Sequence, residues 1–302
     1  MSVFERPIPR RALLIKAGVA GLGASLALAG SSTAPRRKDR ATAGSVHLAL
    51  LSDTHIPEDT NDSYRGFYPY QNLQQITREL ISNRPDAVVI TGDLARLSGQ
   101  VGDYRNLERL LSPLARQRPV YMTVGNHDNR DNFLKVFAKL PGERQSVRGK
   151  YVVVAGLPAV RLIMLDSLFM VNKVPGLLGK AQRSWLQNYL RASDDTPTVL
   201  CFHHTLGDGD GDLLDLPRLY DIVEPIRKVK AIIFGHSHEY RFSRYKGIAQ
   251  INLPATAYNF SDREPVGWVE ARLTARTGQF ILHATGGNKD QDGTTKTLAW
   301  RT

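Results

Sequence analysis

Five short polar segments of this 302-residue chain each come directly after an apolar run rich in β-branched residues. Apolar runs of this kind, alternating with stretches of helical period, indicate buried strands of an α/β domain. Ligand sites of such domains lie outside the carboxyl ends of the strands, so we expect the five segments to meet in one cleft. The segments are residues 52–55 (SDTH), 92–93 (GD), 125–128 (GNHD), 201–204 (CFHH) and 235–238 (GHSH).

These segments hold six of the eight histidines of the chain, together with aspartates and an asparagine. Imidazole and carboxylate form the ligand mix that suits zinc, iron or manganese, and a carboxylate can bridge two ions. Any one segment alone is as consistent with an ordinary core or loop histidine as with a metal ligand. All five together predict a site for a pair of metal ions.

The order of the segments closely resembles that of the calcineurin-like metallophosphoesterase superfamily, and the resemblance covers about residues 46–267. It implies an α/β (α+β) fold, a four-layer αββα sandwich of two mixed β-sheets flanked by helices. It also implies the metal ligands. One ion would bind Asp53, His55 and His238, a second would bind Asn126, His203 and His236, and Asp93 would bridge both.

The resemblance also gives roles to residues beside the ligands. His127 would stand outside the ligand set and supply a proton to the leaving group. Of the histidine pair, His203 follows the apolar run directly and is the expected ligand, which leaves His204 a supporting or substrate-facing position. Asp128 would fix the loop or orient His127, because a ligating group usually has an orienting partner just outside the metal.

Substrate contacts are expected at two places. Arg130, just past GNHD, either contacts a phosphate oxygen or is a helix-start arginine without a role in the site. The loop of residues 56–70 is rich in aromatic residues, and Tyr68 and Tyr70 either stack on the substrate or fold back on the core.

Some residues within the motifs differ from those of two branches of the superfamily, and these differences argue against both branches. Arg96 stands three residues after Asp93, where purple acid phosphatases carry a tyrosine ligand, and GDLARLSG differs from the GDYVDRG-like segment of protein Ser/Thr phosphatases. The motif set of this chain resembles that of bacterial cyclic-nucleotide and glycerophosphodiester phosphodiesterases, in which DTH, GDLA, a downstream GDY and GNHDNR occur together. Thr205 departs from the proline that usually follows the histidine pair there.

The function that this resemblance implies is hydrolysis of a small phosphate ester, a phosphodiester rather than the alternative phosphomonoester. Two divalent or mixed-valence ions of iron, manganese, zinc or cobalt would activate a bridging water and bind the phosphoryl oxygens. A rival from another class is a non-catalytic metal-binding scaffold. Such scaffolds lose ligands, whereas all seven ligand positions are present here.

Residues 1–29 have the pattern of a twin-arginine signal peptide. Arg10 and Arg11 precede a Gly/Ala-rich, weakly hydrophobic stretch, and residues 27–29 (ALA) offer a small-residue cleavage site. We expect a linker over residues 30–44 and the metallophosphoesterase domain over residues 45–302. The twin-arginine export machinery is then a partner, and the mature protein is periplasmic or extracellular without a stable membrane span. The alternative is an uncleaved inner-membrane anchor.

The net charge of +11 is concentrated near the start, where residues 1–40 hold eight Lys/Arg against two Asp/Glu. The rest of the chain has no stripe of Lys/Arg with interleaved aromatics, so a nucleic-acid partner is not expected. Cys201 is the only cysteine, which excludes an intramolecular disulfide.

Helical periodicity predicts helices at residues 70–82, 101–115, 131–138, 180–191 and 213–227. After GHSH the pattern changes to short strands, which we expect to pair antiparallel and complete a sheet. These strands are residues 241–245, 248–253, 267–274 and 279–285. The last dozen residues, rich in Gly, Thr, Asp and Lys, are expected to form a frayed tail.

Overall fold

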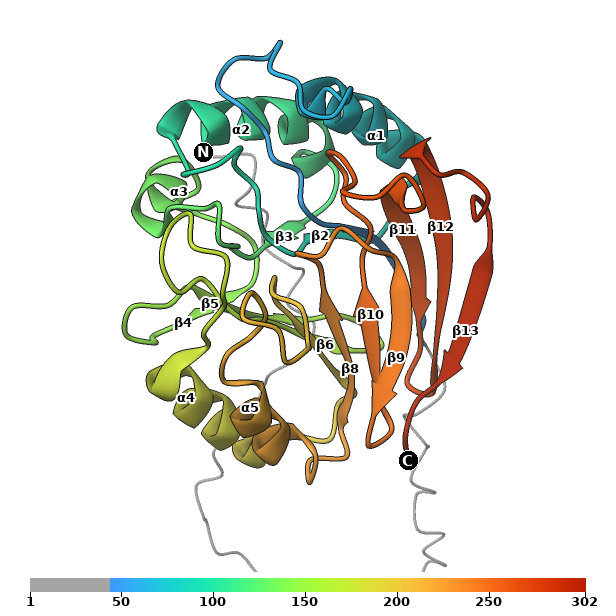
Figure 1. The fold of residues 1–302 in the computed structure, drawn as a ribbon. Coiled ribbons are helices and arrows are strands. Elements are labelled where there is room, and N and C mark those ends of the chain that lie inside the picture. The colour runs from blue at the N-terminus through green and yellow to red at the C-terminus, as the bar shows by residue number, and fades with distance from the viewer. Residues whose placement is uncertain (1–43) are drawn as a thin grey trace, which may run out of the picture.

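Two mixed β-sheets pack face to face in the computed structural model, which describes residues 44–302 (Figure 1). The six-stranded sheet has the order β13-β12-β11-β1-β2-β3. Its strands are β1 (Val46–Leu51), β2 (Ala87–Ile90), β3 (Val120–Met122), β11 (Pro265–Leu273), β12 (Thr277–Gly287) and β13 (Thr295–Ala299).

The second sheet has seven strands in the order β4-β5-β6-β7-β8-β10-β9. They are β4 (Glu143–Gln145), β5 (Val152–Gly156), β6 (Arg161–Met164), β7 (Thr198–Cys201), β8 (Val229–Phe234), β9 (Arg241–Tyr245) and β10 (Ile248–Asn252).

Five helices cover the outer faces of the two sheets, which completes the predicted four layers (Figure 1). Helices α1 (Pro69–Asn83), α2 (Val101–Ala115) and α3 (Arg130–Val136) lie on the six-stranded sheet. Helices α4 (Gly179–Ala192) and α5 (Leu216–Val223) lie on the other. The chain therefore has the αββα architecture that its motifs predicted.

The central strands of the second sheet are buried on both faces, which is why their sequences are continuous apolar runs. In β6, Leu162 and Met164 belong to the core between the sheets, whereas Ile163 belongs to the core under α4 and α5. The same alternation holds in β7, where Val199 faces one core and Leu200 the other.

Seven strands run parallel to a neighbour and bring their carboxyl ends to one side of the molecule. These are β1, β2 and β3 in the first sheet and β6, β7, β8 and β10 in the second. The polar segments begin at, or within three residues of, the last residue of β1, β2, β3, β7 and β8. Parallel pairing thus explains how segments far apart in sequence reach one place.

Two expectations about the carboxyl-terminal half need correction. The last dozen residues are not a frayed tail, because β13 pairs antiparallel with β12 and Leu298 and Trp300 are buried. The short strands after GHSH do not complete a single sheet. β9 and β10 extend the second sheet, with β10 parallel to β8, and β11 and β12 extend the first.

The fifth helix is shorter than its periodicity suggested and begins at Leu216 instead of residue 213. The preceding residues pair with another loop, since the Leu214 amide donates to the Gly176 carbonyl (2.9 Å). The Asp215 carboxylate accepts from the amides of Leu178 and Gly179. These contacts fix the loop after β7 against the loop after β6.

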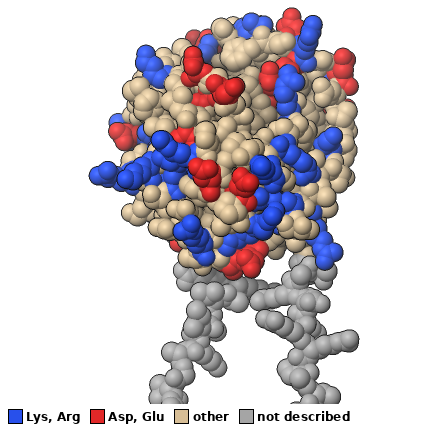
Figure 2. Space-filling view, turned by 60° about the horizontal axis from the view of Figure 1, so that its bottom comes forward, with Lys and Arg blue, Asp and Glu red and all other residues tan. Residues whose placement is uncertain are grey.

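Figure 2 shows Lys and Arg spread over the face at the bottom of Figure 1, with Asp and Glu between them. No helix among residues 44–302 is both long and apolar enough to cross a membrane. The predicted signal peptide, and the predicted linker except for Gly44, lie outside the described residues.

Candidate metal centre

The predicted ligand residues sit on sharp turns just past the strand ends. Five of the seven have a left-handed backbone conformation with positive φ, namely Asp53 (52°), His55 (43°), Asp93 (45°), His236 (75°) and His238 (57°). This conformation costs a non-glycine residue about 1–2 kcal/mol. It is held here by backbone hydrogen bonds between motifs, such as Asp53 N to Gly92 O (3.1 Å) and His55 N to Asp93 O (2.9 Å). Strain of this kind concentrates at functional sites.

Two motif glycines allow these turns to approach one another. A Cβ atom on Gly125 would collide with Asp93 Oδ1, and one on Gly235 would collide with Ser52 Oγ and Asp53 Oδ2. The glycines of GNHD and GHSH are therefore needed for close packing around the two carboxylates.

The first ligand cluster joins Asp53, His55 and His238. Asp53 Oδ1 lies 3.3 Å from His238 Nε2 and 4.0 Å from His55 Nε2, and the two Nε2 atoms are 3.3 Å apart. All three residues are buried, and Asp53 Oδ1 has no hydrogen-bond partner. A buried carboxylate oxygen without a donor is costly unless a cation binds it.

The second cluster joins Asp93, His203 and His236, with Asn126 beside them. His203 Nε2 lies 3.2 Å from Asp93 Oδ2, from Asn126 Oδ1 and from His236 Nδ1. Asp93 Oδ2 is also 3.7 Å from His55 Nε2 of the first cluster. This carboxylate therefore lies between the clusters, where a bridging ligand is required.

The outer nitrogens of the four histidines fix the tautomers of the rings. Each donates to a backbone carbonyl: His55 Nδ1 to Arg96 O (3.3 Å), His203 Nδ1 to Thr91 O (3.0 Å), His236 Nε2 to Gly211 O (3.0 Å) and His238 Nδ1 to Tyr258 O (2.6 Å). Only an N–H can make these bonds, so each neutral ring turns a lone pair inward. Converging lone pairs and carboxylates fit two metal ions.

Protonation equilibria agree with a ligand set. Burial lowers the pKa of His55 to about 3 and that of His236 to about 4, so both rings are neutral at pH 7. Burial opposes ionisation of Asp53, but His238 and His203 outweigh it and lower the pKa of this carboxyl below its usual range. Burial lowers the pKa of His203, yet Asp93 and Asp53 raise it to about 9. A metal ion would replace this proton.

His127 lies outside both clusters. Its Nδ1 donates to the Leu97 carbonyl (2.8 Å), and its Nε2 stands 4.0 Å from Asp93 Oδ2. The side chain is 22% exposed, whereas the ligand histidine side chains His55, His203 and His238 are at most 2% exposed. The ring is thus fixed beside the Asp93 carboxylate and is partly exposed to solvent.

Asp128 makes the contacts of a residue that fixes the loop. Its carboxylate accepts from the amides of Gly125, Leu94 and Ala95 and from the Tyr104 hydroxyl (2.8–3.1 Å). Tyr104 in turn accepts from the Asn129 amide (2.8 Å). Asp128 therefore ties GNHD to the loop that carries Asp93.

The residues expected to contact substrate lie in different surroundings. His204 is buried, bonded to Ser167 Oγ through Nδ1 (2.7 Å), and packed against His203 and His236. Arg130 forms an ion pair with buried Asp166 (Nη2 to Oδ1, 2.8 Å).

Tyr68 and Tyr70, from the loop of residues 56–70, also lie in different surroundings. Tyr70 packs against the core between the sheets, which is the alternative that the sequence left open for it. Tyr68 is 44% exposed at the start of α1. Another tyrosine of this loop, Tyr64, lies with its ring 4.8 Å from that of Tyr258, which in turn stacks on His55.

Sequence reasoning missed Tyr258 and Phe260. The Tyr258 ring stacks on His55 (4.8 Å) and contacts His238 (5.0 Å), and the Phe260 ring stacks on His238 (4.3 Å). Both residues follow β10, one of the parallel strands that point to the site. Their position after an apolar strand was the signal available in the sequence.

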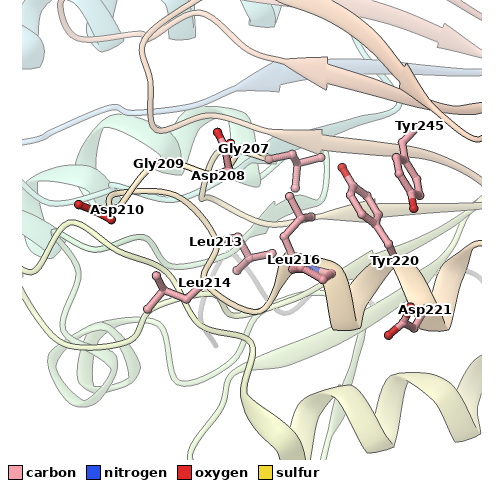
Figure 3. A pocket seen from close by; sticks show the side chains of 12 residues that line it. Gly207, Asp208, Gly209, Asp210, Leu213, Leu214, Leu216, Tyr220, Asp221 and Tyr245 are labelled. Atoms are coloured by element: carbon pink, nitrogen blue, oxygen red, sulfur yellow. The ribbon is translucent and has the colours of Figure 1, made fainter.

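A cavity of about 710 Å³ opens at the loop after β7 (Figure 3). The GDGDGD loop of residues 207–212 forms one wall, and the stacked rings of Tyr220 and Tyr245 (3.6 Å) form another. The same loop supplies the Gly211 carbonyl that holds His236. This loop therefore contacts both the cavity, through residues 207–210, and His236, through Gly211.

Residues 46–240 match the family model described as calcineurin-like phosphoesterase, a span that includes both ligand clusters. The chain belongs to this family. This chain, with both candidate ligand clusters formed, is a metal-dependent phosphoric ester hydrolase.

Named relatives with similar sequences are phosphodiesterases. The chain is 28% identical to a probable cyclic nucleotide phosphodiesterase of Vesicomyosocius okutanii, over 73% of this chain and 91% of that protein. It is 27% identical to a glycerophosphodiester phosphodiesterase of Enterobacter lignolyticus, over 70% and 77%. It is 26% identical to a 3',5'-cyclic adenosine monophosphate phosphodiesterase of Pseudomonas aeruginosa, over 73% and 80%.

Solved structures support the fold. A purple acid phosphatase of yellow lupin aligns with a TM-score of 0.64 at 14% identity, over 85% of this chain and 54% of that one. A dimetal phosphatase of Danio rerio aligns with a TM-score of 0.63 at 14% identity, over 84% and 99%. These similarities show a shared αββα architecture.

Proposed function

We propose that this protein hydrolyses small phosphodiesters and that two metal ions bind the clusters, one at Asp53, His55 and His238 and one at Asn126, His203 and His236, with Asp93 bridging. Iron, manganese, zinc and cobalt all suit this mixture of imidazole, carboxylate and amide oxygen. When bound, the ions supply Lewis acidity toward the phosphoryl oxygens and a water activated for attack.

The charge around the centre supports a diester over a monoester. The two arginines adjoining the metal motifs are each paired with a carboxylate, Arg96 with Asp62 (2.8 Å) and Arg130 with Asp166. A monoester dianion needs positive donors beyond the metal ions, whereas a diester carries one negative charge. The neutralised arginines are the observation that carries this preference.

The protein's own residues have separate tasks in this scheme. Asp93 keeps the two clusters together, and the Asp128 contacts keep GNHD against it. His127, in its protonated form, is oriented by the Leu97 carbonyl so that Nε2 can give its proton to the leaving oxygen. The neighbouring rings of Tyr258 and Phe260 limit access of water from the side of His238.

The names of the relatives point in the same direction, since they act on cyclic nucleotides or glycerophosphodiesters. All of these are small phosphodiesters. A substrate of this class is our proposal for the present chain.

Bis(4-nitrophenyl) phosphate is expected to be cleaved with a higher kcat/KM than 4-nitrophenyl phosphate. Both rates should vanish after chelation and return on addition of manganese, iron, zinc or cobalt, one of which gives the highest rate. Steady-state kinetics on the two esters after each readdition measure this. A preference of about tenfold for the monoester, equivalent to about 1.4 kcal/mol in transition-state binding, would favour a phosphatase instead.

We also propose export by the twin-arginine machinery, supported by Arg10 and Arg11 ahead of an apolar stretch. Replacing both arginines by lysine keeps the charge, so full-length precursor is expected to accumulate in the cytoplasm. Cell fractionation followed by immunoblotting measures this. Normal amounts of processed protein outside the inner membrane would contradict the proposal.

A further inference from the structure

Large hydrophobic side chains that remain exposed among residues 44–302 gather at one end of the molecule. Nine such residues are at least 36% exposed, and all lie on loops after the carboxyl ends of β1, β2, β6, β7 or β10, where the metal ligands meet. They are Tyr64, Tyr68, Leu97, Phe169, Met170, Val171, Val174, Leu214 and Phe260.

Five of the nine form what we call the apolar rim: Phe169, Met170, Val171, Val174 and Leu214, each 36–56% exposed. Four lie on the loop after β6 and one on the loop after β7. Hydrogen bonds join the two loops, from Leu214 N to Gly176 O (2.9 Å) and from Gly176 N to Asp212 O (3.0 Å). The two loops that carry the apolar rim are therefore fixed to each other.

The apolar rim is also attached to the second ligand cluster. The Asn172 amide donates to the backbone carbonyl of Asn126 (2.7 Å), which ties this loop to a residue of the second cluster's surroundings. Val174 lies against Gly211, whose carbonyl holds His236. Groups on a substrate bound at the centre would thus meet the apolar rim.

Isolated exposed hydrophobic residues are common and need no explanation, but a clustered apolar patch marks a binding surface. Beyond Leu214 the surface continues into the cavity of Figure 3, where Leu213, Leu216 and Tyr220 contribute apolar walls. The charged residues that line this cavity are Asp208, Asp210 and Asp221. They would repel a group with additional negative charge.

We propose that the site takes a phosphodiester with an uncharged, apolar arm, an alkyl or aryl group, and that the apolar rim binds this arm. The inference rests on the proposed phosphodiesterase function. The rings of Tyr258 and Phe260 lie beside the first cluster and the loop of the apolar rim is bonded to Asn126 at the second, so the two arms of a diester bound at both clusters would have these two surfaces on either side. A glycerol or ribose arm would leave the apolar rim in water.

Alkyl 4-nitrophenyl phosphates with methyl, butyl and hexyl groups test this, because the leaving group stays constant while the apolar arm grows. A fully buried methylene contributes about 0.8 kcal/mol of binding free energy, and a methylene on a half-exposed surface contributes less. We therefore expect kcat/KM to rise about tenfold or more from the methyl to the hexyl ester. The triple variant Met170→Gln, Val174→Thr and Leu214→Asn keeps the side-chain shapes close to the originals. It should reduce the hexyl-to-methyl ratio to about threefold or less.

The matched control is Leu157→Asn, a partly buried leucine in the turn between β5 and β6, away from the carboxyl ends of the parallel strands. This variant should keep the full hexyl-to-methyl ratio of kcat/KM. An equal rate on all three esters, or a ratio unchanged in the triple variant, would overturn the apolar-arm proposal while leaving the phosphodiesterase intact. Absence of metal-dependent hydrolysis of any diester would contradict both the apolar-arm proposal and the proposed phosphodiesterase function.

The apolar arm could come from a dissolved ester or from a lipid in a bilayer. Phosphatidylcholine vesicles and a short-chain phosphatidylcholine below its micelle concentration distinguish the two sources. Cleavage of the monomeric lipid alone would identify a dissolved amphiphile, and cleavage of vesicles would identify a membrane lipid. Preference for glycerophosphocholine, which lacks acyl chains, over both would contradict the proposal.

Discussion

Replacing Asp93 by alanine is expected to reduce hydrolysis of every phosphate ester by about 10³-fold or more and to release at least one metal ion. Asp93 Oδ2 lies 3.2 Å from His203 Nε2 and 3.7 Å from His55 Nε2, so this carboxylate is the group shared by both clusters. Loss of transition-state charge stabilisation worth several kcal/mol corresponds to this factor, since each 1.36 kcal/mol is tenfold in rate. Elemental analysis of the purified variant and steady-state kinetics measure the two effects.

Asp93 also accepts from the His127 amide (2.9 Å), so the alanine variant changes the position of GNHD as well. Asp93→Asn keeps an oxygen for that amide but removes the charge, and it should lose activity to a similar extent. Asp290→Ala removes an exposed carboxylate that belongs to neither ligand cluster and serves as the control. Two metal ions per chain with near-normal turnover in Asp93→Ala would defeat the bridging assignment.

His127→Ala is expected to keep both metal ions and to lose about 10²-fold or more in kcat on esters with poor leaving groups. The reason is that His127 lies outside both clusters and its Nε2 is free to protonate the departing oxygen. Nitrophenyl esters leave without a proton, so the loss on them should be smaller. Kinetics on an alkyl and a nitrophenyl diester, with metal analysis of the same samples, provide the comparison.

His283→Ala is a matched control for this variant, because His283 is a partly exposed histidine of β12 that stacks on Trp268 away from the ligand clusters. It should leave the ratio of the two substrates unchanged. Loss of a metal ion in His127→Ala would make His127 a ligand. An equal loss on both substrates would instead point to a role in positioning the bridging carboxylate.

The sequence was informative about the ligands because each ligand is local to a strand end. An apolar run followed at once by SDTH, GNHD or GHSH is readable without tertiary information, and parallel pairing then brings the segments together. Helix α2 was predictable to its ends, Val101 and Ala115, because its apolar positions repeat with helical period and Asp103 forms a capping box with Gln100.

Residues whose roles depend on distant partners were harder to place. Arg130 lies next to GNHD, yet it pairs with Asp166, 36 positions along the chain. The carboxyl-terminal tail has a polar, glycine-rich composition, but Thr295–Ala299 forms β13 because the edge of β12 offers unpaired backbone groups. Tyr258, rather than Tyr68 or Tyr70, stacks on His55 because β10 ends beside the first cluster.

The sequence by itself determined the family, the layered architecture and the identities of the candidate ligands, since each is encoded by residues a few positions apart. Only the tertiary structure decided the tautomers of the four histidines, which depend on the carbonyls of Thr91, Arg96, Gly211 and Tyr258. It also decided the neutralised charge of Arg96 and Arg130 and the gathering of exposed apolar side chains around the centre. These properties arise from contacts between segments that the chain separates widely, and no local pattern encodes them.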